Sequence, residues 1–274
     1  MWLIPLGHQV GSVKTLEMNW ITRLGVSCHP RMKLVCIPYA GGGPAAFQGW
    51  AEGLNAAGIE ICAVRLPGRE SRWKEEPLRS VLDVVAPLSM AILRILEGPY
   101  ALYGHSLGAI LAFETARELR RQGAAEPEHL LVSACPAPQL PWNDPPMRHL
   151  DREEFLREIQ NRYGEFPADV RGNCELLDLL LPSLRADIEM LETYRYSPER
   201  PLDCPITAYG GLLDRMVPQR LLHAWRAQTT NAFQLHMVSA GHFCLPAVHA
   251  RRLHDLESPP SAEQEQPVSP TQLN

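Results

Sequence analysis

Residues 100–113 read YALYGHSLGAILAF: a short apolar run, a Gly-His-Ser-Leu-Gly turn and a second apolar run compatible with a helix. Between a strand and a helix, the G-x-S-x-G pattern is typical of a sharp turn that holds its serine clear of the backbone. Gly104 and Gly108 flank the serine because so tight a turn leaves no room for side chains. We therefore predict that Ser106 is a nucleophile. The N–H of Leu107, which begins the helix, is the predicted first donor to a developing oxyanion.

Strand-like and helix-like segments alternate around this turn. The expected strands are 33–37, 59–64, 100–104, 130–134, 205–209 and 233–238, and the expected helices in the first half are 47–57, 80–96 and the run from Ser106 to about Gly123. Pro87 is expected to kink or restart the second of these helices. No regular structure is predicted before Lys33. This alternation predicts an α/β protein with a mostly parallel sheet covered on both faces by helices.

The alternation breaks at Pro136. Residues 137–200 begin rich in proline and then continue as helix-like sequence without a strand. Asp151 is the predicted N-cap of one helix, with Glu154 three residues later. A further apolar helix is expected to end at Leu181, and Pro182 to open the next. Helices inserted between two sheet strands predict a lid above Ser106, because their apolar faces need burial. The alternative is a helical subdomain without a gating role.

Two turns after the last strands carry the residues that a serine nucleophile needs. A serine hydroxyl reacts only when a base takes its proton, and an acid orients that base. For a serine on such a strand-to-helix turn, the partners are expected to follow in the chain order Ser, Asp or Glu, His, each after a strand. Asp214 follows the strand at 205–209, and His242 follows the strand at 233–238, so we predict Ser106, His242 and Asp214 as nucleophile, base and acid. Asp187, in the helical insertion, and Asp203, before its strand, fit this pattern less well.

Two loops near the start of the sheet have two readings each. The glycine cluster at 39–44 lacks the lysine and spacing of a P-loop. It fits an oxyanion loop in which the N–H of Ala40 is the second donor, or else a plain glycine turn. Arg69 and Arg72 are placed to meet a phosphate or, as the nearby glutamates favour, to form a solvated ion-pair network.

Composition excludes several classes of protein. The formal charge of −5 and pI of about 6.1 argue against nucleic acid as the main partner. The seven cysteines are odd in number and scattered, which favours reduced, buried thiols. Neither H-E-x-x-H nor a set of paired Cys/His ligands is present, so no metal is expected. Residues 1–30 lack a secretory signal, and no apolar run is long enough to span a bilayer. We predict a cytoplasmic protein.

Several motifs together resemble the type II thioesterase family. They are IPYAGG at 37–42, LPGR at 66–69, GHSLG at 104–108, LLPSLRAD at 180–187, YRY at 194–196, GGLLD at 210–214 and GHF at 241–243. The resemblance covers about Lys33 to Val248. It implies an α/β-hydrolase fold with a helical lid and the hydrolysis of acyl thioesters on the phosphopantetheine arms of carrier domains. Such enzymes edit or release acyl groups in polyketide and nonribosomal peptide biosynthesis. The implied partners are acyl or peptidyl carrier domains, and the expected enzyme is a monomer without a cofactor of its own.

The expected organisation is an N-terminal extension at 1–31, an α/β-hydrolase domain at 32–257 with its lid at about 137–200, and a disordered tail at 258–274. Two other functions stay open. One is a serine esterase that uses the same triad on small soluble esters. The other is a non-catalytic binding module on a hydrolase scaffold, against which the intact Ser, Asp and His in the expected order argue.

Overall fold

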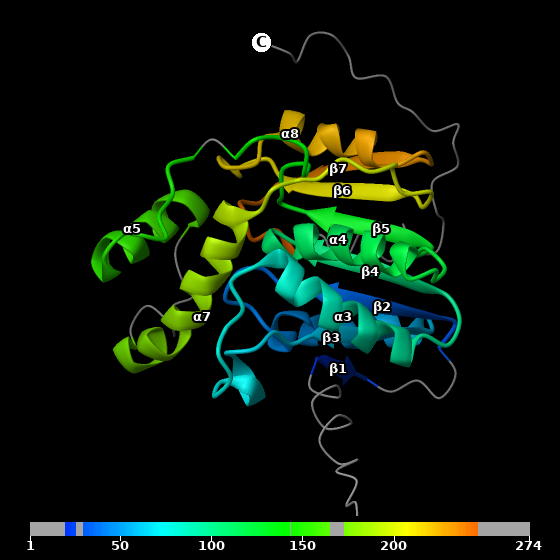
Figure 1. Cartoon of the computed structure of the whole chain (residues 1–274), viewed down its shortest axis with the longest axis horizontal. Helices are drawn as coiled ribbons and strands as arrows, with labels where there is room; N and C mark the ends of the chain where they lie inside the picture. Colours follow the sequence, from blue (N-terminus) through cyan, green and yellow to red (C-terminus); the bar gives the residue numbers. More distant parts are fainter. Residues whose placement is uncertain (1–19, 26–29, 143, 165–172, 246–274) are drawn as a thin grey trace, which may run out of the picture.

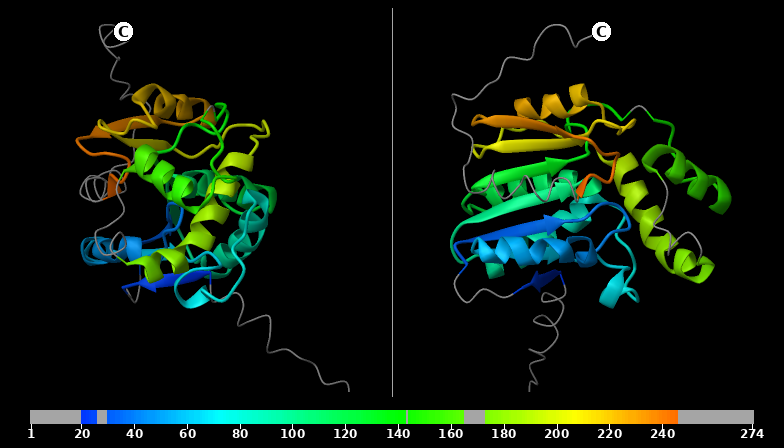
Figure 2. Two further views of the ribbon diagram at one scale, coloured as in Figure 1. Left: turned by 90° about the vertical axis from the view of Figure 1, so that its left-hand side faces the viewer. Right: turned by 180° about the vertical axis from the view of Figure 1, so that it is seen from behind.

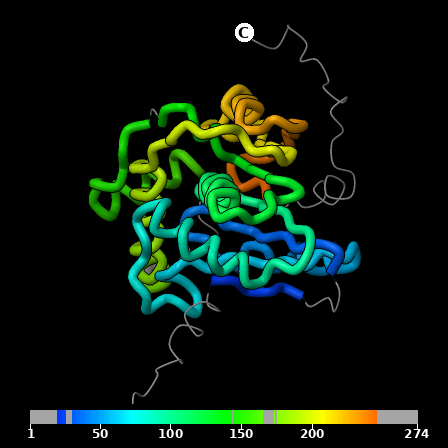
Figure 3. Tube along the Cα trace, turned by 45° about the vertical axis from the view of Figure 1, so that its right-hand side comes forward, coloured from blue at the N-terminus to red at the C-terminus, as the bar shows by residue number. Residues whose placement is uncertain are grey.

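A seven-stranded sheet forms the centre of the protein (Figure 1). The computed structural model describes residues 20–25, 30–142, 144–164 and 173–245. The strands lie in the order β1-β3-β2-β4-β5-β6-β7, so the sheet runs from the dark blue β1 to the orange β7 (Figure 3). Their bounds are β1 Ile21–Leu24, β2 Met32–Ile37, β3 Ile59–Val64, β4 Tyr100–His105, β5 His129–Ser133, β6 Ile206–Gly211 and β7 Phe233–Val238. All neighbouring strands are parallel except β1, which is antiparallel to β3. The predicted mostly parallel sheet is confirmed.

Helices cover both faces of the sheet. One face packs against α3 (Val81–Ile95), α4 (Leu107–Arg121), α8 (Gln219–His223) and the 3₁₀ turn η3 (Ala224–Gln228). The other face packs against the 3₁₀ turn η1 (Pro44–Trp50) and α2 (Ala51–Ala56). A further 3₁₀ turn, η2 (Glu70–Arg72), lies in the loop after β3. None of the described helices is long and apolar enough to cross a membrane.

The side chains of the central strands explain these two layers. Along β2, Val35 and Ile37 belong to the core under α3 and α4, while Leu34 and Cys36 belong to the core under η1 and α2. Successive residues of a strand point to opposite faces, so a strand covered on both sides must be apolar throughout. These four residues are fully buried. Burial on both faces therefore selects the continuous apolar runs seen in the sequence.

The structure contains a strand that the sequence pattern did not predict. β1 pairs Ile21 with Val64 and Leu24 with Ile61, at the edge of the sheet. The expectation that regular structure begins at Lys33 is therefore wrong. The reason is the short length of β1 and its position: an edge strand of four residues, with no fully buried member, shows neither an apolar run nor a clear alternation.

Two prolines lie inside continuous helices, although a kink or restart was expected at Pro87 and the start of a new helix at Pro182. α3 continues through Pro87, and α7 (Cys174–Thr193) is one helix that contains Pro182. Proline leaves the carbonyl four residues earlier without its helical donor. Those carbonyls belong to Asp83 and Asp178, which are exposed residues, so water is able to hydrate them. The expected restart of a helix at Pro182 is wrong.

The segment between β5 and β6 lies at the carboxyl ends of the parallel strands. It contains α5 (Arg152–Tyr163) and α7, which stand beside the arrowheads of the strands (Figure 2, right). The predicted cap is confirmed: Asp151 Oδ1 accepts a hydrogen bond from the N–H of Glu154 at 2.9 Å. In its described part this segment has no strand of the sheet. The predicted tail at 258–274 and most of the extension at 1–31 lie outside the described residues.

Candidate active site

Ser106 occupies a strained turn between β4 and α4. Its backbone has φ 55° and ψ −119°, a conformation that non-glycine residues rarely adopt. The flanking glycines are required by close packing. A Cβ at Gly104 would lie 2.0 Å from the carbonyl oxygen of Gly108, and a Cβ at Gly108 would lie 2.2 Å from that of Ile37. The N–H of Ser106 donates to the carbonyl of Ser133 at 2.8 Å, which ties the turn to β5.

The three residues predicted to act together lie within hydrogen-bond distance. His242 Nε2 is 3.1 Å from Ser106 Oγ, and His242 Nδ1 is 2.8 Å from Asp214 Oδ2. The second carboxylate oxygen of Asp214 accepts the N–H groups of Met216 at 2.9 Å and Val217 at 3.2 Å. The carboxylate is therefore held by its own turn. In this arrangement Nδ1–H donates to Asp214, which leaves Nε2 free to accept the serine proton.

The turns that carry Asp214 and His242 are joined by backbone contacts. After β6, the N–H of Leu213 donates to the carbonyl of Ala240 at 2.9 Å. A Cβ at Gly211 would lie 2.2 Å from the same oxygen, so only glycine permits this approach. Because β6 and β7 are parallel, both turns lie at the carboxyl ends of the strands, where Ser106 follows β4.

The glycine loop after β2 lies beside Ser106. The N–H of Gly42 donates to the carbonyl of Tyr39 at 2.9 Å, which closes a four-residue turn. Gly41, its third residue, has φ +77°, the value that a type II turn requires there and that favours glycine. Ala40, the second residue, lines the same pocket as Ser106. Leu107 is the first residue of α4. The structure thus places both candidate oxyanion donors next to the serine, and their roles stay predictions.

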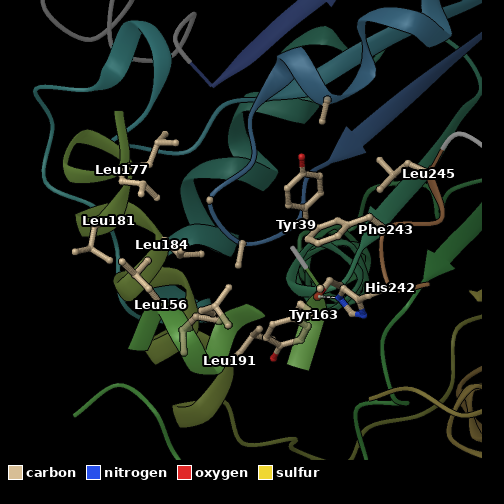
Figure 4. A pocket seen from close by; sticks show the side chains of 18 residues that line it. Tyr39, Leu156, Tyr163, Leu177, Leu181, Leu184, Leu191, His242, Phe243 and Leu245 are labelled. Carbon is tan, nitrogen blue, oxygen red and sulfur yellow. Dashed lines mark hydrogen bonds between the residues drawn. The ribbon is translucent and has the colours of Figure 1, made fainter. Parts of the chain in front are cut away.

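An apolar pocket lies beside His242 and Phe243 (Figure 4), and Ser106 is among its lining residues. Its volume is about 490 Å³. Leucine and isoleucine side chains from α5 and α7 form the wall opposite the serine: Leu156, Ile159, Leu177, Leu180, Leu181, Leu184, Ile188 and Leu191. Tyr39, Phe243 and Leu245 complete it on the side of the sheet. The two helices of the insertion therefore cover the serine with apolar side chains.

The aromatic surroundings of His242 were not predicted from the sequence. The ring of Tyr163, from α5, lies 4.8 Å from the imidazole of His242, and that of Phe243 lies 5.5 Å from it. His105 is fully buried behind the turn, and its Nδ1 is 3.1 Å from Ser133 Oγ. Burial lowers the pKa of His105 well below its usual value, so this imidazole is neutral. Aromatic residues at such positions are indistinguishable from core residues until the fold brings them to the site.

Arg69 and Arg72 form ion pairs, but not the solvated network that was expected. Arg69 is 3% exposed and Arg72 is 5% exposed. Arg72 pairs with Glu75 at 2.6 Å, and Arg69 pairs with Asp187 at 2.7 Å. The expectation of solvation is wrong because α7 covers Arg69 from a distant part of the sequence. Asp187 therefore pairs with Arg69 and not with His242. Asp203, the other candidate acid, pairs with Arg200.

Comparison with known proteins agrees with this geometry. The model of the thioesterase domain family matches residues 32–255. The gramicidin S biosynthesis protein GrsT of Aneurinibacillus migulanus is 38% identical over 227 residues, which cover 83% of this chain and 88% of GrsT. The thioesterase PikA5 of Streptomyces venezuelae is 38% identical over 227 residues, which cover 82% of this chain and 80% of PikA5. The solved type II thioesterase BorB from the borrelidin biosynthetic cluster superposes with a TM-score of 0.80 at 34% identity, covering 87% of this chain and 96% of BorB.

The chain therefore belongs to the thioesterase family. The resemblance to type II thioesterases and the α/β-hydrolase fold are both confirmed. Its reaction class is the hydrolysis of thioesters.

Proposed function

We propose that Ser106, His242 and Asp214 are the catalytic triad of this thioesterase. The observation that carries the proposal is the continuous chain from Asp214 through His242 to Ser106, with distances of 2.8 and 3.1 Å, at the foot of an apolar pocket. His242 is buried and oriented by the carboxylate, and so is prepared to accept a proton from the serine.

The reaction then proceeds through two acyl transfers, first to Ser106 and then to water. Ser106 Oγ attacks the thioester carbonyl carbon while its proton passes to His242 Nε2. The C–S bond breaks, and the leaving thiolate takes that proton. A water molecule next attacks the acyl-enzyme, again giving a proton to His242, which returns it to Ser106 as the free acid departs. The N–H groups of Ala40 and Leu107 stabilise the oxyanion in both steps.

The pocket supports an apolar acyl group as substrate. The pocket has a volume of about 490 Å³, and α5 and α7 form one of its walls, so it has room for an acyl chain with many methylenes. Most of its lining is apolar and offers no partner to a charged group. We propose that the thiol is the phosphopantetheine arm of an acyl or peptidyl carrier domain, and that the enzyme edits or releases acyl groups in polyketide or nonribosomal peptide biosynthesis. The solved type II thioesterase YbtT, 32% identical to this chain, comes from the yersiniabactin NRPS/PKS pathway, and ClbQ, 29% identical, comes from the colibactin NRPS/PKS pathway, which supports this assignment.

We also propose that the enzyme is a cytoplasmic monomer without a cofactor or metal of its own. Nucleophile, base and acid all come from side chains of one chain, which supports a monomer that needs no cofactor or metal. Among the described cysteines, Cys62, Cys135, Cys204 and Cys244 are free thiols, which supports a cytoplasmic location.

A comparison of two substrates, each incubated separately with the enzyme, tests the proposal. Purified enzyme is incubated with an acyl-carrier domain and, separately, with an aryl oxoester of the same acyl chain. Mass spectrometry of the carrier is expected to show loss of the acyl group at a kcat/KM well above that for the oxoester, and no loss with Ser106→Ala. Preferential cleavage of the oxoester would instead identify an esterase.

A further inference from the structure

A buried ion pair joins α7 to the loop after β3. Arg69 Nη1 donates to Asp187 Oδ2 at 2.7 Å, and Nη2 donates to Oδ1 at 2.8 Å. The contact is bidentate, which gives a planar guanidinium and a carboxylate one defined geometry. The side chain of Asp187 is 0% exposed and that of Arg69 is 2% exposed. The pair is therefore shielded from water.

Both partners of this pair also hold the glycine loop. The N–H of Gly41 donates to Asp187 Oδ2 at 2.7 Å. Arg69 Nη1 donates to the carbonyl of Gly42 at 3.1 Å. Arg69 additionally lies within 3.4 Å of the carbonyl of Pro67, in its own turn. Three distant segments thus meet at one carboxylate and one guanidinium, and the loop beside Ser106 is the segment that they fix.

The bond to Gly41 fixes the peptide that a turn of this kind is free to flip. In the turn from Tyr39 to Gly42, the central peptide joins the carbonyl of Ala40 to the N–H of Gly41. Rotation of this peptide converts a type II turn into a type I turn, and glycine at the third position tolerates both. A flip would replace the Gly41 N–H by the Ala40 carbonyl, which would then face the carboxylate of Asp187. Electrostatic repulsion disfavours that state.

The same helix meets the loop through an apolar contact. Leu184, one turn before Asp187 on α7, lies so close that a Cβ at Gly41 would be 3.3 Å from its Cδ1. Leu184 also lines the acyl pocket. α7 therefore contacts the glycine loop both through a residue of the pocket wall, Leu184, and through a member of the ion pair, Asp187. The position of Ala40 relative to Ser106 depends on how this helix is seated.

We propose that Asp187 and Arg69 are positioning residues for the oxyanion site. They hold the loop from Tyr39 to Gly42 against α7, so that the N–H of Ala40 is preorganised before the thioester reacts. The inference rests on the proposed function, in which Ala40 is an oxyanion donor. Fixed donors stabilise a developing charge far better than donors that must reorient during the reaction.

The variant Asp187→Asn tests this role. It keeps the size of the side chain and an accepting oxygen, but removes the charge that holds Arg69 and Gly41 together. For a soluble acyl thioester we expect kcat to fall about 10- to 100-fold with KM changed by less than about twofold, since complete loss of one oxyanion donor costs about 10²- to 10³-fold in kcat. Arg69→Lys, which keeps the charge but loses the fork, is expected to lower kcat by a smaller factor.

Inhibitor binding separates positioning from a structural role. Ser106 Oγ adds to the carbonyl carbon of a trifluoromethyl ketone, its proton passes to His242, and the resulting alkoxide occupies the oxyanion site. In Asp187→Asn the Ki of an acyl trifluoromethyl ketone is expected to rise by the factor lost in kcat. The Kd of a thioether of the same chain length, which forms no oxyanion, is expected to stay unchanged.

Glu189→Gln is the matched control. Glu189 lies two residues further along α7 and pairs with Arg79 at 2.6 Å, so it tethers the same helix by its own ion pair. It is expected to keep wild-type kcat and Ki. Wild-type kcat and ketone affinity in folded Asp187→Asn would overturn the proposal, as would equal losses of ketone and thioether binding with a lowered melting temperature. Failure of the proposed triad would differ, because Ser106→Ala would then keep the wild-type turnover and ketone affinity.

Discussion

The ring of Tyr163 lies 4.8 Å from the imidazole of His242, centroid to centroid, with the two planes 54° apart. Tyr163 is the last residue of α5, so the helical insertion directly contacts the residue that we assign as the base. Phe243, the next residue in the chain, contacts the same imidazole, and the planes of the two rings are 86° apart (Figure 4). Two aromatic rings therefore restrict the imidazole to the orientation in which it meets both Asp214 and Ser106.

Loss of the ring of Tyr163 is expected to slow turnover. Aromatic pairs contribute about 0.5–1.5 kcal/mol beyond burial. Release of His242 by Tyr163→Ala should therefore lower kcat/KM about tenfold, at about 1.4 kcal/mol per factor of ten. Tyr163→Phe keeps the ring and should stay near the wild-type value. Steady-state kinetics on one acyl thioester measures both, and a loss of the same size in Tyr163→Phe would assign the effect to the hydroxyl instead.

Asp214→Asn is expected to lower kcat by about 10⁴-fold while the fold is kept, because an amide no longer selects the imidazole tautomer that accepts the serine proton. Asp203→Asn is the control, since Asp203 is an exposed aspartate that pairs with Arg200. It should leave kcat unchanged. If Asp203→Asn lost activity while Asp214→Asn kept it, the acid would be misassigned. Circular dichroism checks that both variants are folded.

The pocket wall is expected to set the acyl chain length. Leu181 lines the pocket, whereas Leu179, on the same helix, is 52% exposed. Leu181→Trp fills space that two methylenes would occupy, and each buried methylene is worth about 0.8 kcal/mol, so kcat/KM for long chains should fall about 15-fold. Short acyl chains should be hydrolysed at the wild-type rate. Leu179→Trp is expected to leave the dependence of kcat/KM on acyl-chain length unchanged. If both variants changed this dependence equally, the acyl chain would bind elsewhere.

Gly108→Ala is expected to destabilise the protein despite its place in a helix. Alanine is favoured over glycine in helices by about 1 kcal/mol. A Cβ here would lie 2.2 Å from the carbonyl oxygen of Ile37, a contact that the backbone cannot avoid without moving β2 away from α4. Overpacking costs about 3 kcal/mol at the upper end of its usual range, so we expect a net loss of about 2 kcal/mol in the free energy of unfolding. Gly49→Ala meets no atom within 4 Å and should change stability by less than about 0.5 kcal/mol. Urea denaturation distinguishes the two variants.

Stability is expected to fall in mild acid because of His105. Burial lowers its pKa well below the usual value, whereas in the unfolded chain it titrates near 6.5. Between these two pKa values the unfolded state binds more protons. The stabilisation is therefore complete above about pH 6.5 and is lost as the pH falls below it.

The variant His105→Gln should reduce this dependence. Its melting temperature is expected to fall less between pH 7 and pH 5.5 than that of the wild type, even if it starts lower. His223→Gln, at an exposed histidine, should keep the wild-type slope. Parallel curves for the wild type and His105→Gln would show that another group causes the acid sensitivity.

The sequence predicts most of the sheet and the candidate triad because their signals are local. Buried parallel strands are apolar throughout, and the strained turn at Ser106 needs two glycines at fixed spacing. Chain order then selects Asp214 and His242, since each follows a strand directly. The strands β3 and β7 are found at the predicted residues.

The remaining features depend on contacts that no local pattern records. Arg69 and Asp187 are 118 residues apart, and only the seating of α7 on the glycine loop makes them partners. β1 is a strand because β3 offers it a free edge, and not because Ile21–Leu24 shows a strand pattern. Pro182 stays within a helix because its side of α7 faces solvent. Tertiary packing decides each of these features.

Trapping of the acyl-enzyme tests the central claim most directly. Asp214→Asn, which is expected to slow deacylation, is mixed with an acyl-carrier thioester, quenched in acid, and digested for peptide mass spectrometry. We predict one adduct with the mass of the acyl group, located on Ser106 and absent from the variant that also carries Ser106→Ala. An adduct on another residue, or turnover by Ser106→Ala alone at the wild-type rate, would contradict the account.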